Sequence, residues 1–403
     1  MDNPSPHRSY AVPAAMQGSD GFDDIRPYRS EEVPDVLRNL LQDPEFQAVV
    51  AYIARLTGQQ PDALAQAIGR CRSTEDFQIG IIYPFLQQLL AQATTSISAN
   101  FSAVAPADAA PDAASDARAY TFVSNHRDIV LDSALLSFLL HDHGMKTVEI
   151  AIGDNLLIRP WIKDLVRVNK AFIVQRALTM RQMLLASAKL SRYVRYAVTE
   201  KHENIWIAQR EGRAKDSDDR TQESVLKMLA IGGDLRQLNI VPLAITYEYD
   251  PCDHLKAQEF QLKRDNPGFK KSPQDDLDNM RTGIFGPKGK VHYHAAPPLN
   301  RWIETLPTDI SKNDFFPAVA QRIDQQIHSH YHLYPGNYVA ADMLRESSAF
   351  AHHYTQQQAL AFKDYIAGKL QRVSLPQPDV PFLTERMLTM YANPVFNQQH
   401  ALA

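Results

Sequence analysis

The chain has 403 residues, a formal net charge of −4 at pH 7 and two cysteines. That length is sufficient for one large α/β domain or for two domains, with a substantial buried core. The near-neutral charge balance excludes a general nucleic-acid-binding surface, so any basic patch must be local. Cys71 and Cys252 stand alone in the sequence and form no metal or redox motif, which predicts a reduced, cytosolic compartment.

No apolar run reaches the roughly eighteen uninterrupted residues that a membrane-spanning helix requires. The best candidate, residues 129–140, is short and is interrupted by Asp132 and by two serines. Residues 1–20 lack the apolar centre of a signal peptide. We therefore expect a protein that is soluble or lies on a membrane surface, and not one that spans the bilayer.

The N-terminal part of the chain divides into three segments by composition. Residues 1–28 contain Pro, Ser and Asp without periodicity, which predicts a disordered tail. Residues 30–100 carry apolar residues at helical spacing, up to Ile97, and predict a helical N-terminal region. Its polar faces are not basic enough for a typical surface-bound membrane helix, which favours packing on the main domain over contact with lipid. Residues 102–118, rich in Ala, Asp and Pro, predict a flexible connection.

Strand patterns alternate with helix patterns over residues 119–300. This alternation predicts an α/β domain with a mainly parallel or mixed sheet that is flanked by helices. The expected strands are a segment that begins at Tyr120 and residues 147–152, 171–174, 204–208, 239–247 and 290–295. Residues 301–403 predict a helical C-terminal extension, in which the last thirty residues, with four prolines, are expected to wrap the surface.

A polar corner, residues 124–126, follows the first expected strand and precedes an apolar helix. It places His126 close to Asp128 and Asp132, which are the groups needed for an oriented general base. In one continuous helix, residues six apart are separated by about 9 Å of rise and roughly 120°. Either the chain folds back so that Asp132 reaches His126, or Asp128 is the partner. In both cases a carboxylate would fix the imidazole tautomer while the other ring nitrogen takes a proton from a substrate hydroxyl.

A structural interpretation of the same corner is also open, in which Asp128 caps the helix, Asp132 is solvated and His126 is an ordinary loop residue. The sequence alone does not choose between this interpretation and the catalytic one.

Cationic residues follow the third and fourth expected strands, namely Arg176, Arg210, Arg213 and Lys215. In a parallel sheet these strand ends lie on the same edge as His126. Arginine binds phosphate oxygens bidentately, and Gly212 lets the backbone approach a ligand closely. The set predicts a site for a phosphorylated or otherwise anionic alcohol. The alternative for each cation is a solvated charge that pairs with acidic neighbours in residues 216–219.

These segments resemble the sequence blocks of the glycerolipid acyltransferases, the family that includes glycerol-3-phosphate and lysophosphatidate acyltransferases. The matching segments are Asn125-His126 with a following Asp, Phe172 to Arg176, Glu211-Gly212-Arg213 and Val241-Pro242-Leu243. They occur in the family's order and cover about residues 118–250.

The blocks also depart from the family pattern in three places. Four residues usually separate His and Asp in the first block, whereas Asp132 stands one residue further on and Asp128 is closer. Lys170 replaces the glycine that opens the second block, and Gly212 adjoins Arg213 where the family has one residue between them. These shifts indicate a divergent subfamily and leave the catalytic carboxylate open.

The resemblance implies that a hydroxyl of glycerol phosphate or of a lysolipid attacks an acyl thioester on coenzyme A or acyl carrier protein. His126 would be the general base, oriented by Asp132 or Asp128. Arg176, Arg213 and Lys215 would hold the anionic head group, and Glu211 and Gly212 would shape that pocket. No cofactor, metal or nucleic acid is implied. The enzyme would be cytoplasmic, peripherally associated with the inner face of the membrane, with glycerol-3-phosphate, lysophosphatidate or a lyso-aminolipid as the acceptor.

Two other functions compete with this one. A non-catalytic lipid-binding protein could keep the fold with shifted motifs, although the retained His126 argues against it. A metal-dependent hydrolase is suggested by histidine groups at His292, His294, His328, His330, His332, His352 and His353. No carboxylate or cysteine pattern completes a zinc site there, so surface histidines are the better interpretation. The acidic residues 216–219 are likewise better interpreted as a helix cap than as a Mg²⁺ site.

Overall fold

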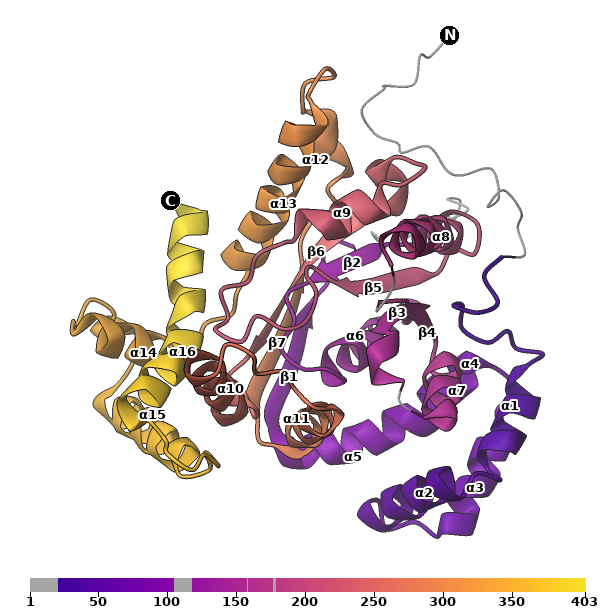
Figure 1. The fold of residues 1–403 in the computed structure, drawn as a ribbon, viewed down its shortest axis with the longest axis horizontal. Coiled ribbons are helices and arrows are strands. Elements are labelled where there is room, and N and C mark those ends of the chain that lie inside the picture. Colours follow the sequence, from indigo (N-terminus) through magenta and orange to yellow (C-terminus); the bar gives the residue numbers. More distant parts are fainter. Residues whose placement is uncertain (1–20, 105–117, 158, 177–178) are drawn as a thin grey trace.

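The computed structural model describes residues 21–104, 118–157, 159–176 and 179–403. Within these residues a seven-stranded sheet has the order β1-β7-β6-β2-β5-β3-β4 (Figure 1). The strands are β1 (Thr94–Asn100), β2 (Thr121–Ser124), β3 (Val148–Gly153), β4 (Ala171–Val174), β5 (Asn204–Ala208), β6 (Ile240–Tyr247) and β7 (Gly289–Ala295). All neighbouring pairs are parallel except β6 and β7. The predicted α/β class, a mainly parallel or mixed sheet flanked by helices, is confirmed.

The central strands are buried on both faces. Every residue of β2 and β6 is buried, as expected for apolar strands between two helical layers. Phe122 of β2 belongs to the core on one face, with helices α5 (Tyr83–Ala93) and α6 (Leu131–Asp142). Val123 belongs to the core on the other face, which is covered by α8 (Met180–Thr199), α9 (Glu223–Leu229) and α13 (Lys312–Ser329).

The N-terminal helices form a small core of their own. They are α1 (Val33–Leu40), α2 (Pro44–Leu56), α3 (Pro61–Arg70) and α4 (Thr74–Phe77), followed by a π-helical turn (Gln78–Ile82) that leads into α5. Val168 of α7 (Pro160–Val168) is buried in this core, so the helices pack on the sheet domain, as favoured from the sequence.

Two details of the N-terminal prediction were wrong. The helical pattern does not reach Ile97, because the chain turns at Ala93 into β1, where β-branched Thr94, Thr95 and Ile97 favour an extended backbone. Residues 21–28 of the expected tail are also ordered. Phe22 and Ile25 are buried against the sheet domain, and the amide of Ile173 donates to the carbonyl oxygen of Ile25 at 2.8 Å.

Parts of the predicted domain scheme lie outside the described residues. These parts are residues 1–20 of the expected tail and residues 105–117 of the expected connection. The boundaries of the scheme therefore stay predictions.

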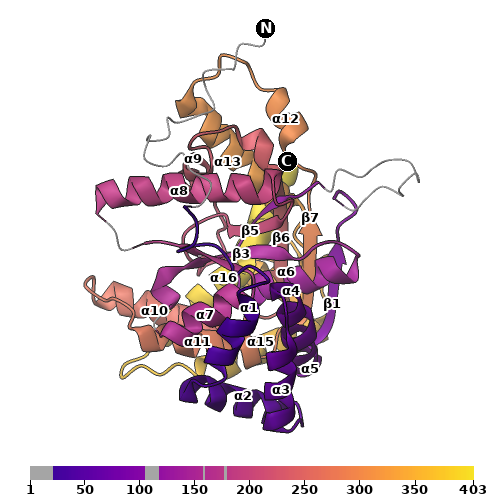
Figure 2. The same cartoon turned by 90° about the vertical axis from the view of Figure 1, so that its right-hand side faces the viewer.

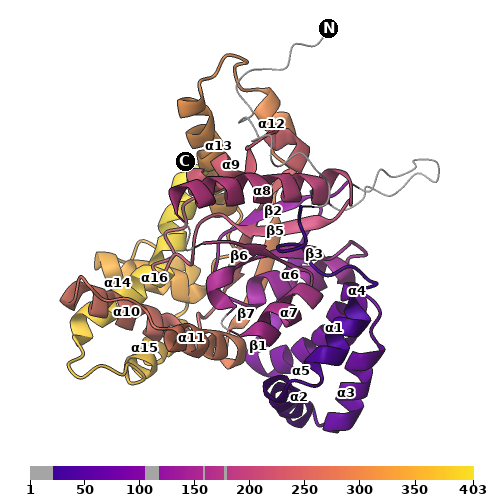
Figure 3. The same ribbon diagram turned by 45° about the vertical axis from the view of Figure 1, so that its right-hand side comes forward.

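Residues 300–402 are largely helical, with α12 (Asn300–Glu304), α13, α14 (Pro335–Arg345), α15 (Gln356–Leu370) and α16 (Val380–Leu402). Helices α14 to α16 share a core with α10 (Asp253–Asp265), and Figure 3 shows them grouped beside the sheet. The expectation that the last thirty residues wrap the surface was wrong, because α16 is 23 residues long and buries Met387 and Tyr391. Pro381 stands in its first turn, where no amide hydrogen is needed. No helix among the described residues is long and apolar enough to cross a membrane.

Candidate active site

Two buried side chains fix the corner between β2 and α6. Trp206 Nε1 of β5 donates to Ser124 Oγ at 3.0 Å. Asn125 Nδ2 donates to the carbonyl oxygen of Ile245 at 2.9 Å, and Asn125 Oδ1 accepts from the Ile245 amide at 2.8 Å. The Asn125 side chain therefore forms with Ile245 of β6 the two hydrogen bonds that the backbone of a neighbouring strand would otherwise form. This arrangement sets the direction in which the chain enters His126.

The chain then folds back on itself, so that His126 reaches the first turn of α6. His126 Nδ1 lies 2.8 Å from Asp132 Oδ2. The same carboxylate oxygen accepts from the amides of Arg127, at 2.6 Å, and Asp128, at 3.0 Å. The other, Oδ1, accepts from the Tyr247 hydroxyl at 3.0 Å. Asp132 is thus a buried acceptor with four donors, and the interpretation of a solvated Asp132 was wrong.

The Asp132 contact defines the tautomer of His126. A carboxylate at Nδ1 keeps the ring hydrogen on that nitrogen, which leaves Nε2 as a lone-pair acceptor. No described residue hydrogen-bonds Nε2, and the side chain retains 13% exposure. A histidine that a carboxylate orients in this way can act as a general base through its other ring nitrogen.

Asp128 has a different set of contacts. Its Oδ1 accepts from the amides of Val130, at 2.9 Å, and Leu131, at 2.8 Å, in the manner of a helix cap. Burial, together with the negative charge of Asp132, raises the pKa of Asp128. Of the two carboxylates, the structure brings Asp132 and not Asp128 to the imidazole.

The predicted cations lie on the same edge of the sheet but have different partners. Arg176 Nη1 lies 3.1 Å from Glu211 Oε1, which joins the loops that follow β4 and β5. Gly212, in the same loop as Glu211, has a φ of +66°, in the left-handed region that favours glycine. Lys215 Nζ pairs with Glu259 Oε1 of α10 at 2.9 Å, so the structure holds Lys215 against that helix.

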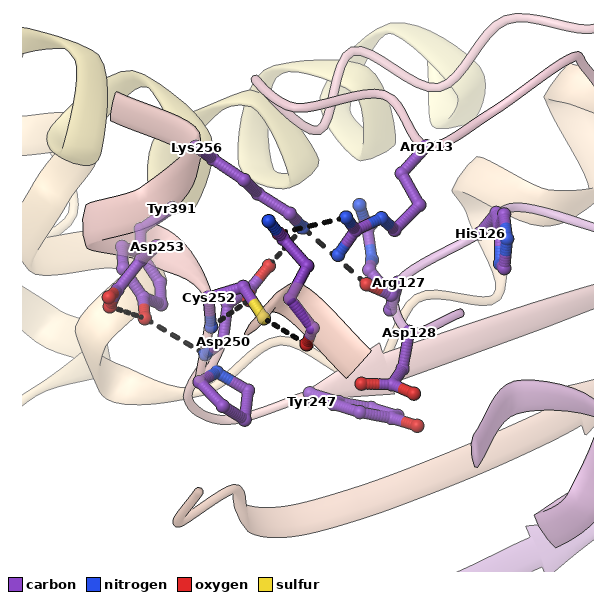
Figure 4. Close-up of polar contacts among 12 residues, drawn as sticks. His126, Arg127, Asp128, Arg213, Tyr247, Asp250, Cys252, Asp253, Lys256 and Tyr391 are labelled. Carbon is purple, nitrogen blue, oxygen red and sulfur yellow. Dashed lines mark hydrogen bonds and ion pairs between the residues drawn. The ribbon is translucent and has the colours of Figure 1, made fainter. Parts of the chain in front are cut away.

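Arg213 is placed closer to the corner. Its Nη2 donates to Asn279 Oδ1 of α11 (Pro273–Phe285) at 3.0 Å, while its buried Nη1 has no partner among the described residues. Figure 4 shows its guanidinium beside Arg127, with His126 on the right of the same view. An unpaired buried donor at this corner, where Arg213 interacts electrostatically with Asp128, suits an anionic ligand.

Several buried residues around the histidine were missed from the sequence. Arg127 Nη2 pairs with Asp219 Oδ2 at 2.7 Å, and Lys256 Nζ contacts Asp250 and lies 3.5 Å from the Arg127 carbonyl oxygen. The sequence could have indicated Tyr247, because this residue ends the strand next to β2. Lys256 had no such signal, because it belongs to a charged helix with no recognisable motif.

The histidines form a cluster that the sequence did not predict. His292 and His294 of β7 face His332 and His330, with ring centroids 5.1 Å and 4.1 Å apart. Burial, together with His330 and His292, lowers the pKa of His294 to about 4. Among the described residues, no group of three histidines, cysteines or carboxylates could hold a metal ion.

The segment that contains this corner is similar to a known protein family. Residues 109–246 match the family model described as Acyltransferase. Among solved structures, the chain is similar to the crystal structure of the 1-acyl-sn-glycerophosphate (LPA) acyltransferase, PlsC, from Thermotoga maritima. The sequence identity is 11% and the TM-score is 0.37, and the match covers 75% of this chain and 99% of that chain. No curated protein matches the chain significantly.

Proposed function

We propose that this chain, whose residues 109–246 match the acyltransferase family model, transfers a fatty acyl group to the hydroxyl of a glycerol phosphate or lysophospholipid. The acyl donor is acyl-CoA or acyl carrier protein. The enzyme works at the cytoplasmic face of a membrane, without a cofactor. The observation that carries the proposal is the 2.8 Å contact between His126 Nδ1 and the fully buried carboxylate of Asp132.

The chemistry begins with proton removal. His126 Nε2 takes the proton of the acceptor hydroxyl as its oxygen attacks the thioester carbonyl carbon. Asp132 stabilises the imidazolium that forms. The tetrahedral intermediate then collapses, the carbon–sulfur bond breaks, and the thiolate leaves with the proton that His126 returns. General base catalysis of this kind contributes about 10²- to 10⁴-fold in rate.

The acceptor's anionic head group binds next to the histidine, at the carboxyl edge of the sheet. Arg213 supports this because its Nη1 is buried and has no partner among the described residues. Arg176 contributes a second cation, which the structure pairs with Glu211. Binding of a phosphate would replace that carboxylate, and Gly212 leaves the backbone room for the approach.

A transfer assay with the full chain tests the proposal. Radiolabelled palmitoyl-CoA and palmitoyl acyl carrier protein are offered with glycerol-3-phosphate, lysophosphatidate and a lyso-aminolipid. We expect one acceptor to be acylated by the wild type and the rate to fall at least about 100-fold in His126→Ala. His400→Ala, an exposed histidine near the end of α16, is the control and should keep the wild-type rate.

If folded wild type acylates none of these acceptors with either donor, the acyl-transfer proposal is wrong. A non-catalytic lipid-binding role then becomes the better account of the fold.

A further inference from the structure

The first two turns of α8 carry an exposed apolar stripe. Met180, Met183 and Leu184 are 88%, 54% and 61% exposed. Their spacing of three and four residues places them on one face of the helix. The buried residues of α8 begin only at Ala188, so these turns extend beyond the core. In Figure 2, one end of α8 projects past the sheet on the side where α10 lies.

The stripe lies at the same edge of the sheet as the histidine. Strands β2, β5, β3 and β4 are parallel neighbours in that order, so Ser124 and Val174 end on one edge. Three strand spacings separate them by about 15 Å. The chain then passes from Arg176, which contacts the loop after β5, to the start of α8 at Met180. The helix that carries the stripe therefore starts from the same edge of the sheet as the loop of His126.

The charge within the stripe is positive, because Arg181 is exposed between Met180 and Met183. Arg176, which precedes the helix, pairs with Glu211. Cations next to inserted apolar residues are attracted to the anionic surface of a membrane. Flexible methionine side chains also suit a fluid partner without fixed pockets. Three side chains give only a fraction of the roughly 800 Å² per partner that a stable protein interface buries, which argues against a second copy of the chain.

We propose that Met180, Met183 and Leu184 insert into the interface of an anionic lipid bilayer, with Arg181 at the head-group level, and that this docking positions the carboxyl edge of the sheet over the lipid acceptor. The role in acceptor delivery rests on the proposed acyltransferase function. The insertion itself does not.

The test measures binding of the full chain to phosphatidylcholine vesicles with and without phosphatidylglycerol. The variant M180S/M183S/L184S should bind anionic vesicles at least about tenfold more weakly than wild type. The control L360S/V380S/L402S replaces three residues of similar exposure, 56%, 51% and 68%, on α15 and α16 and should bind like wild type. Arg181→Gln should weaken binding about fivefold, and only to the anionic vesicles.

Equal vesicle binding by wild type and the α8 variant, or no binding by wild type, would overturn the inference. So would light scattering that shows a wild-type dimer and a monomeric α8 variant, because the stripe would then join two copies. Acyl transfer to a detergent-dispersed acceptor separates the two proposals. The α8 variant should keep its rate there and lose it on vesicles. A wild type that binds vesicles through the stripe but acylates no acceptor refutes the acyl-transfer function alone.

Discussion

Gly283 of α11 packs directly against the carboxylate of Asp128, so closely that a Cβ at position 283 would overlap Asp128 Oδ2. The carboxylate cannot swing away freely, because its other oxygen accepts the amides of Val130 and Leu131. Because α11 lies beyond the segment that matches the acyltransferase model, this contact ties a later part of the chain to the corner that carries His126.

Gly283→Ala should therefore displace α11 and lower the free energy of unfolding by about 1–3 kcal/mol, as overpacking does. Urea unfolding measures this change, and the transfer assay should show a reduced rate. Gly368→Ala is the matched control, because Gly368 is also helical and has no atom within 4 Å of an added Cβ. It should leave stability unchanged or raise it by up to about 1 kcal/mol. Equal stabilities of the two variants would show that α11 does not press on Asp128.

Asp132→Asn should lower kcat at least about 100-fold, because the amide cannot stabilise the imidazolium and favours the wrong tautomer. Asp128→Asn should have a much smaller effect, since its amide oxygen can still accept from Val130 and Leu131. Steady-state kinetics on the two variants compare them directly. A larger loss of kcat in Asp128→Asn would reverse the assignment of the carboxylate.

The sheet could be predicted from the sequence because most of its strands are apolar runs that end at polar corners. The run that ends at Tyr247 is an example, since all of β6 is buried. β1 could not be recognised in the same way. Its residues, Thr94–Asn100, are polar and half-exposed, and they follow α5 without a break. Only pairing with β7, almost two hundred residues later, shows that this segment is a strand.

The choice between Asp132 and Asp128 could not be predicted because it depends on contacts rather than on spacing. Tyr247 and two backbone amides hold the Asp132 carboxylate under the imidazole. The pairing of Arg127 with Asp219 likewise joins residues from loops after different strands. In contrast, the cations at the strand ends could be placed on one edge, because parallel strands end there. Their individual partners, such as Glu259 for Lys215, depend on the later helices.

Arg213→Gln should raise KM for the anionic acceptor about ten- to a hundredfold, because it removes the buried, unpaired guanidinium nitrogen. KM for the acyl donor should change little. Initial rates with each substrate varied in turn measure both constants. Arg38→Gln, an exposed cation on α1, is the control and should change neither constant. If the donor KM rises instead, Arg213 contacts the donor and not the acceptor.

The histidine cluster predicts a loss of stability in mild acid. The pKa of His294 is lowered to about 4, first by burial and then by His330 and His292, whereas a histidine in the unfolded chain titrates near 6.5. Below about pH 6.5 the unfolded state binds a proton that the folded state does not bind until about pH 4, so stability falls across this window. His294→Gln should flatten the dependence of the unfolding free energy on pH between these values. His400→Gln, which replaces an exposed histidine, should keep the wild-type slope. Urea unfolding at several pH values compares the three proteins. If the unfolding free energy of His294→Gln varies with pH as in the wild type, His294 is protonated in the folded protein as readily as in the unfolded chain.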